Sequence, residues 1–215
     1  MSHYSIKSVL NIIPTGLCLA GFLSNAAGQQ VATDGPGADT KRVETSNRRN
    51  PIPDISVTDE NGNARHFYSD LVKGKVVAIN FVFTTCSTIC PPLGATFGKL
   101  QRSLGGHFGK DIFLISISVD PTTDTPARLR SWAAQFSAKP GWTLVTGDKL
   151  ELNRLLKALG SDVASPENHS PMVLIINDKA ALWKRVYGLG STAALTRSIE
   201  QMRAASAVSS SPKTP

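Results

Sequence analysis

Residues 76–83 form a near-continuous apolar run, Val-Val-Ala-Ile-Asn-Phe-Val-Phe, and this run limits the folds that the chain can adopt. A run of this kind is typical of a strand that is buried in a central sheet. A second buried strand is predicted at residues 112–119, and a helical pattern separates the two. Strands joined in this way pair in parallel through a right-handed crossover, which indicates an α/β fold.

The other patterns place these two strands in a longer alternation of strands and helices. Asn61-Gly62, between two short strand patterns, predicts a β-hairpin before the first buried strand. A second hairpin and a helix complete the pattern. This order is typical of a thioredoxin-like fold with a central mixed sheet, flanking helices and an N-terminal β-hairpin. The additional elements expected are strands at 55–57, 65–67, 142–145, 172–176 and 182–187, and helices that begin near Pro91, Thr125, Asp148 and Ser191.

Both ends of the chain lie outside this pattern. Lys7, an apolar run at 9–23 and the small-x-small motif Ser24-Asn25-Ala26 are typical of an export signal. The run is about 15 residues long, which is short for a bilayer span, so a cleaved signal is favoured over a retained anchor. The predicted segments are a signal peptide or N-terminal membrane segment at 1–27, a flexible linker at 28–50, a thioredoxin-like domain at 51–205 and a disordered tail at 206–215.

The charge pattern argues against nucleic-acid binding. The chain has a net charge of +7, but its basic residues are scattered, and no stripe of them is interleaved with aromatic residues. A basic surface of this kind is an ordinary one, and no nucleic-acid partner is expected.

Two of the three cysteines, Cys86 and Cys90, form a close pair directly after the first buried strand. They stand in residues 83–91, Phe-Thr-Thr-Cys-Ser-Thr-Ile-Cys-Pro, where a helix begins, so both sulfurs can point to the same side. The helix N-terminus favours negative charge and lowers the pKa of a thiol, which supports metal binding and redox reactivity. Thiolates select a soft ion such as Cu(I), and an imidazole completes a three-coordinate site. Cys18 lies in the N-terminal apolar run and is interpreted as a small hydrophobic residue.

His169 is the histidine expected beside the cysteine pair. His3 lies in the export signal, while His66 and His107 are expected to be solvated surface residues. His169 immediately precedes a buried strand, and in a thioredoxin-like topology that loop returns beside the cysteine loop. Zinc is a rival metal, but a soft site with three protein ligands and no fourth donor fits copper better.

Three spaced segments closely resemble the Sco/SenC family of copper-binding assembly factors, within a resemblance that extends over residues 51–187. They are Phe-Thr-Thr-Cys-x-x-x-Cys-Pro at 83–91, Ser-Val-Asp-Pro-Thr-Thr-Asp-Thr-Pro at 118–126 and His-Ser at 169–170. Leu-Val-Thr-Gly at 144–147 also resembles a family segment. One departure is Ser-Thr-Ile at 87–89, where many family members carry Pro-Asp or a similar acidic pair.

The resemblance implies a function and a place of action. It implies copper, Cu(I) or Cu(II), held by Cys86, Cys90 and His169 and delivered to the dinuclear copper centre of cytochrome c oxidase. The expected partner is therefore the copper-accepting subunit of that oxidase. It also implies a periplasmic or intermembrane-space location, commonly with a membrane anchor, so membrane association through the N-terminus is an open expectation.

Two aspartates of the second segment have separate interpretations. Asp120 ends a central strand near the predicted site and is a candidate for orienting His169 or modulating the metal. Asp124 is expected to brace the turn before the helix that begins at Thr125.

A second function is left open by the same residues. A thiol–disulfide oxidoreductase would use Cys86 and Cys90 as catalytic residues to reduce cysteines of an oxidase subunit or another exported protein. Pro171 favours this alternative, because redox thioredoxins place a proline there, typically after a cis bond. Either function requires a thioredoxin-type reductant to keep the pair reduced in an oxidising compartment. A peroxiredoxin-type peroxidase is disfavoured, because Phe83 stands where such enzymes need a hydroxyl residue or a proline.

Overall fold

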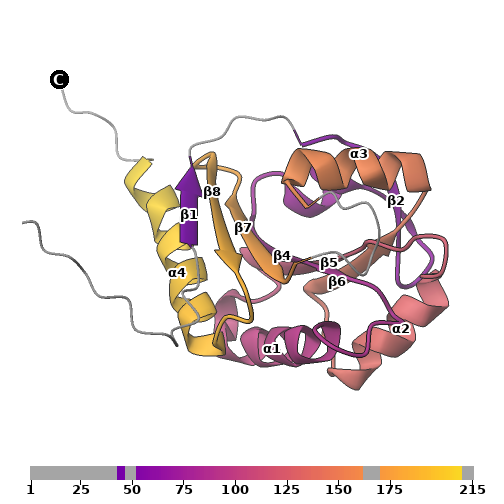
Figure 1. Ribbon diagram of the computed structural model, residues 1–215. Coiled ribbons are helices and arrows are strands. Elements are labelled where there is room, and N and C mark those ends of the chain that lie inside the picture. The colour runs from indigo at the N-terminus through magenta and orange to yellow at the C-terminus, as the bar shows by residue number, and fades with distance from the viewer. Residues whose placement is uncertain (1–42, 47–51, 162–169, 210–215) are drawn as a thin grey trace, which may run out of the picture. The chain divides into compact units, whose positions relative to one another are not determined.

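The computed structural model describes residues 43–46, 52–161 and 170–209 (Figure 1). The predicted export signal, Cys18, His3 and His169 lie outside the described residues. Within the described residues, the helices are too short or too polar to cross a bilayer.

The described strands form one mixed sheet whose order is β1-β8-β7-β4-β5-β6-β2-β3. At its centre β4, β5 and β6 are parallel, whereas β7 pairs with β4 in the antiparallel direction. β4 is buried along its whole length, as its apolar run predicts. The strands are β1 (Val43–Ser46), β2 (Ser56–Asp59), β3 (Ala64–His66), β4 (Val76–Val82), β5 (Ile112–Ser118), β6 (Trp142–Thr146), β7 (Met172–Asn177) and β8 (Leu182–Tyr187).

Helices cover both faces of this sheet. Figure 1 shows α1 and α2 on one face and α3 on the other, while α4 contacts α1, β7 and β4. The helices are α1 (Cys90–Ser103), α2 (Pro126–Gln135), α3 (Lys149–Leu159) and α4 (Thr192–Ser209). The architecture is therefore the α/β sandwich that the sequence predicts, and the N-terminal hairpin β2–β3 is part of it.

Local sequence signals fix the ends of two helices. The Thr125 hydroxyl accepts a hydrogen bond of 3.3 Å from the Arg128 N–H and caps α2. The Asp148 carboxylate accepts from the N–H groups of Leu150 and Glu151 and caps α3. α3 stops at Gly160, whose φ of 73° suits a residue without a Cβ.

Close packing places the first turn of α1. A Cβ at Gly94 would lie 2.5 Å from the ring of Phe136, at the end of α2, so only glycine allows this approach. Phe97 of α1 packs on Trp142 of β6, and their ring centroids are 5.6 Å apart. These contacts hold the helix that begins at Cys90 against the sheet.

The structure differs from the predicted boundaries at both ends of the domain. Strand β1 lies inside the predicted linker, because Val43 and the residues after it pair with the free edge of β8. Helix α4 continues to Ser209, four residues past the predicted domain end, because nothing in that segment breaks a helix. The short π-helical turn at Phe67–Val72 was not predicted.

Candidate functional site

The cysteine pair stands where β4 gives way to α1. Residues 83–89 leave the carboxyl end of β4, and α1 begins at Cys90 with Pro91 and Pro92 in its first turn. The Cys86 N–H donates to the Phe83 carbonyl at 3.2 Å and forms a tight turn. This is the edge of the sheet where ligands bind in α/β folds, as the sequence predicts for Cys86.

The two thiols contact one another but differ in exposure. Both cysteines are free; Cys90 has no exposed surface, whereas Cys86 is half-buried. The Cys90 N–H donates to Cys86 Sγ at 3.3 Å, and Thr88 Oγ1 lies 3.8 Å from the same sulfur. Only Cys86 is therefore open to a molecule that approaches from solvent.

The surroundings shift the pKa values of the two thiols in opposite directions. Burial raises the pKa of Cys86, but hydrogen bonds from the Cys90 thiol and N–H, and from Thr88, outweigh it, so the pKa of Cys86 is lowered. Burial raises the pKa of Cys90 to about 12, and its hydrogen bond to Cys86 adds to the increase. Cys86 is thus the thiol that ionises first, and Cys90 retains its proton.

A buried carboxylate braces the loop before Cys86. Asp124 is fully buried and accepts from the Thr84 N–H at 2.9 Å and from the Thr84 hydroxyl at 2.6 Å. Its other oxygen accepts from the Ser118 hydroxyl at 2.6 Å, which ties the loop to the end of β5. The Asp124 N–H also donates to the Asp120 carbonyl, so the predicted turn brace is present. The contact with the cysteine loop was missed from the sequence.

Asp120 also lies in this turn and is partly exposed. Its N–H donates to the Ser118 hydroxyl at 3.1 Å, and its carbonyl accepts from the N–H groups of Thr123 and Asp124. Asp120 is therefore held close to the cysteine loop through Ser118. Its role towards His169 stays a prediction, because His169 lies outside the described residues.

The strand that follows His169 begins beside the end of β4. The ladder pairs Asn80 of β4 with Val173 of β7, so Pro171 and Ser170 fall at the edge where the cysteine loop starts. The Gly188 N–H donates to the Pro171 carbonyl at 2.8 Å and holds this start against the end of β8. Every peptide bond among the described residues is trans, and this includes the bond between Ser170 and Pro171.

The other histidines lie away from the cysteine pair, as expected. His66 is exposed on β3, the outermost strand on its side of the sheet. His107 is exposed, and its Nδ1 lies 3.2 Å from the Asp111 carboxylate, just before β5 begins. Within the described ranges, no group of three or more metal-ligating side chains is present.

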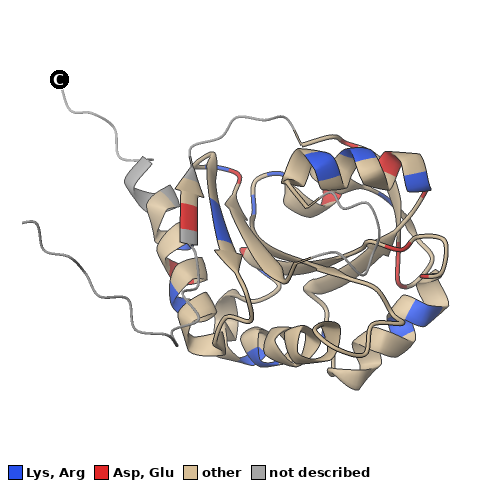
Figure 2. Cartoon of the chain, in the orientation of Figure 1, with Lys and Arg blue, Asp and Glu red and all other residues tan. Residues whose placement is uncertain are grey.

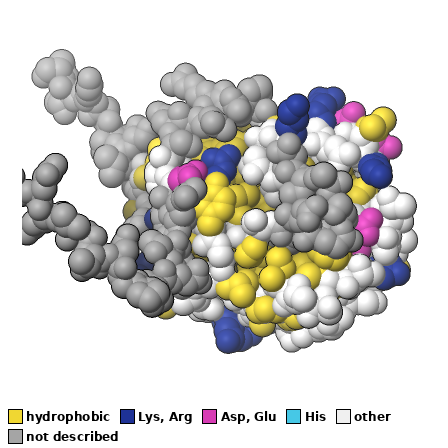
Figure 3. All heavy atoms as spheres, viewed as in Figure 1, with side chains coloured by type: hydrophobic (Ala, Val, Ile, Leu, Met, Phe, Trp, Pro, Cys, Tyr) yellow, Lys and Arg dark blue, Asp and Glu magenta, His cyan; other side chains and the backbone are white. Residues whose placement is uncertain are grey.

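Partly exposed apolar residues form a rim at the same edge of the sheet as the half-buried cysteine. Figure 3 shows hydrophobic side chains gathered between β8 and α1 on the face seen in Figure 1. Residues 83–93 contain no charged side chain. A surface of this kind is suited to contact with another protein. The partly exposed members of the rim are Ile89, Pro91, Pro171, Tyr187 and Leu189.

The chain is similar to curated proteins. The chain is 33% identical to the SCO1 protein homolog of Bacillus subtilis over 119 residues, which are 54% of this chain and 61% of that protein. The chain spans about half the length of the curated relatives it matches.

Two solved structures share the fold. The structure of BsSco, described as a member of the Sco family of cytochrome c oxidase assembly proteins with a disulfide switch, is 26% identical, with a TM-score of 0.60. The match covers 70% of this chain and 92% of BsSco. Bradyrhizobium japonicum ScoI with copper bound is 22% identical, with a TM-score of 0.56, and the match covers 69% of this chain and 96% of ScoI.

The sequence model of the SCO1/SenC family matches residues 44–204, which include the described sheet, the cysteine pair and the loop before β7. This match extends over most of the chain, and the structural relatives have the same thioredoxin-like fold. The chain therefore belongs to the SCO1/SenC family.

Proposed function

We propose that the chain is an exported copper metallochaperone that binds Cu(I) through Cys86, Cys90 and His169. It delivers the ion to the copper-accepting subunit of cytochrome c oxidase, at the dinuclear copper centre. The observation that carries the proposal is the hydrogen bond from the Cys90 N–H to Cys86 Sγ, which holds the two cysteines together at the start of α1, at the edge of the sheet where β7 begins. An imidazole at position 169, two residues before Pro171, is within a short reach of that edge.

The chemistry of the pair suits a soft ion that must be passed on. Two sulfurs and one imidazole form a low-coordination site for Cu(I), which leaves room for a ligand from the acceptor. The Cys90 thiol, with its raised pKa, must release its proton when it binds the metal, so binding releases protons. Cys86, half-buried and with the lower pKa, is the sulfur from which ligand exchange begins.

The relatives support the cargo and the recipient. BsSco is described as a cytochrome c oxidase assembly protein, and the ScoI structure has copper bound. The N-terminal pattern at 1–27 supports export, and therefore a periplasmic site of action in a bacterium.

An anaerobic Cu(I) titration of the purified protein tests the ligand set. We expect a one-to-one complex whose affinity falls at least about 100-fold in His169→Ala, since loss of even a hydrogen-bond partner of a ligand costs 10–100-fold. Cys86→Ser and Cys90→Ser should lose the complex as well. His107→Ala is the matched control, because His107 is exposed and paired with Asp111. Unchanged Cu(I) affinity in His169→Ala would contradict the proposal.

A thiol–disulfide oxidoreductase is the second candidate function. The opposite pKa shifts of the two thiols are those of an attacking thiol and a buried partner that resolves the mixed disulfide. A thioredoxin-type reductant would then regenerate the pair. Disulfide exchange does not need an imidazole, so His169→Ala separates the two functions. A protein that reduces insulin disulfides but ignores copper favours the enzyme.

A further inference from the structure

Arg128 of α2 is held in place beside the cysteine loop. Its Nε donates to the Thr84 hydroxyl at 3.1 Å, and that hydroxyl donates to Asp124 at 2.6 Å. The buried carboxylate therefore fixes the hydroxyl, and the hydroxyl fixes the orientation of the guanidinium. Thr84 is two residues before Cys86, so this cation is bound to the loop that carries the half-buried sulfur.

The guanidinium borders an open cavity of about 320 Å³ between α2 and Thr84 of the cysteine loop. Trp132, which is 4% exposed, forms its apolar floor. The remaining lining is polar or small: Thr84, Ala127, Ser131 and Gln135. A cavity of this volume has room for one side chain of another protein.

The charge of Arg128 is unused within the part of the chain that the structure describes. Arg128 is exposed and forms no ion pair with another described residue. The nearest carboxylate, Asp124, already accepts three hydrogen bonds from Thr84 and Ser118. With Nε engaged, the terminal nitrogens of the guanidinium retain the fork geometry that matches a carboxylate.

We propose that this cavity binds a carboxylate side chain of the protein that exchanges with Cys86, and that Arg128 is the residue that recognises it. The inference rests on the proposed function, because it names the chemistry of the partner at that same site. The partner would combine an apolar contact with the rim around Cys86 and an acidic residue that enters the cavity at α2. The fixed cation selects this partner by charge. It also orients the partner so that Cys86 Sγ can attack it or exchange a ligand with it.

Small disulfides test this inference without copper and without the natural partner. The Cys86 thiolate attacks the probe, forms a mixed disulfide and releases one aromatic thiolate. The Cys90 thiol then attacks the mixed disulfide, closes the Cys86–Cys90 bond and releases the second thiolate, while its proton goes to water. The probes are the dianionic disulfide DTNB and the neutral disulfide dithiodipyridine. The measured quantity is the initial rate with DTNB divided by the initial rate with dithiodipyridine.

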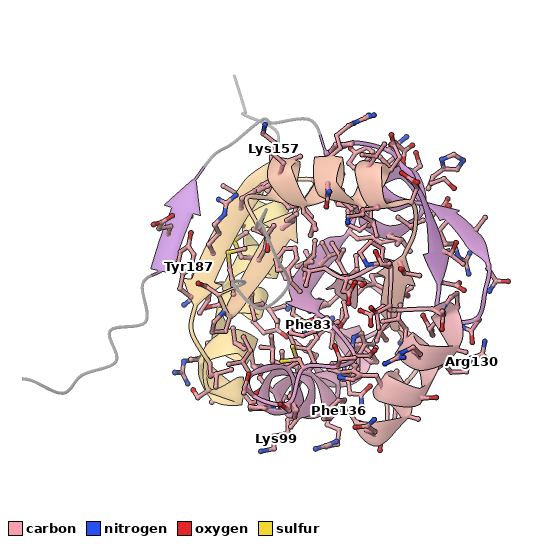
Figure 4. The ribbon with its side chains drawn as sticks, turned by 45° about the vertical axis from the view of Figure 1, so that its right-hand side comes forward. Phe83, Lys99, Arg130, Phe136, Lys157 and Tyr187 are labelled. Carbon is pink, nitrogen blue, oxygen red and sulfur yellow. The ribbon has the colours of Figure 1, made fainter. Side chains whose placement is uncertain are left out.

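Arg128→Gln should lower this ratio about threefold, because an opposite charge close by in a solvated site contributes a factor of this size. The rate with dithiodipyridine should stay unchanged. Arg130→Gln is the matched control: Arg130 is exposed on the same helix but donates to the Glu60 carbonyl, and Figure 4 shows it at the outer rim, away from Phe83. Figure 2 marks the basic residues of α2 in blue along its ribbon.

Two outcomes would overturn the inference. An equal fall in both variants would assign the effect to net charge alone, and an equal fall with both probes would assign it to a disturbed cysteine loop. Arg128→Lys keeps the charge but not the fork, so it should retain only part of the DTNB preference. A protein that shows the DTNB preference but does not bind Cu(I) in the titration would support this inference and contradict the copper proposal. The two failures are therefore distinguishable.

Discussion

Asp59 and Asp124 are both buried carboxylates that hold a loop, but they are neutralised differently. Asp59 lies at the end of β2 and accepts from Asn61, from Asn63 and from the Arg65 guanidinium at 3.1 Å. Asp124 accepts only from neutral groups, the Thr84 N–H and the hydroxyls of Thr84 and Ser118. A full positive charge cancels the field of Asp59, whereas the negative charge of Asp124 still raises the pKa of Cys90. The loop brace at the candidate site is thus also a source of charge there.

The largest difference between Asp59 and Asp124 is expected in what each contributes to the free energy of unfolding. Asp124→Ala leaves the Thr84 N–H and the hydroxyls of Thr84 and Ser118 without their acceptor, and we expect a loss of about 2–4 kcal/mol. Asp59→Ala should cost about 1–2 kcal/mol, because the Arg65 side chain is 45% exposed and can be hydrated again. Urea unfolding of the two variants at pH 7 measures both values. Equal losses would remove the distinction between the two carboxylates.

A second difference concerns the buried thiol. Asp124→Asn removes the negative charge near Cys90 and should lower the pKa of that thiol, so its alkylation at pH 8, which requires the loop to open because Cys90 has no exposed surface, becomes about two- to threefold faster. Asp59→Asn, which changes a carboxylate at another loop, should leave the rate unchanged. Mass spectrometry of the iodoacetamide-treated apoprotein separates Cys86 from Cys90, and Cys86 should react first in every variant. Faster alkylation of Cys86 alone would instead indicate a loosened loop.

The smallest effect is the acid dependence of Asp59. Burial raises its pKa, but hydrogen bonds from Asn63, Arg65 and Asn61 outweigh burial and lower it below 3.8. A lowered folded-state pKa gives stability that is present above the unfolded pKa and lost as pH falls through the folded value. The advantage of the natural protein over Asp59→Asn, about 1 kcal/mol at pH 6, should therefore shrink progressively as the pH falls below 3.8. If the stability advantage over Asp59→Asn instead grew as the pH fell, the pKa of Asp59 would be raised by folding, and the prediction would be wrong.

The central part of the fold could be predicted because its signals are local. The run at 76–83 and the cysteine motif after it are contiguous in sequence, and the structure confirms the strand and the helix start. The caps at Thr125 and Asp148 are confirmed for the same reason.

The contacts that were missed join distant segments. Thr84 and Asp124 are separated by 40 positions, and no periodicity links them. Ser118 carried a signal: like Ser116, it is a hydroxyl residue in a mostly apolar strand, and a buried hydroxyl needs a partner. Strand β1 could not be predicted, because its pairing depends on the edge that β8 leaves free.

The antiparallel ladder between β4 and β7 has a consequence for how this protein can fail. The donors proposed for copper are carried by segments about 80 residues apart, and the pairing of Asn80 with Val173 sets their relative positions. A slip of two residues in that ladder would displace the segment before β7 by about 7 Å, several times the length of a metal–ligand bond. Core substitutions in either strand can therefore abolish the proposed copper binding even though every donor residue is retained. Inherited or engineered changes far from the cysteines should be judged by whether they preserve that alignment.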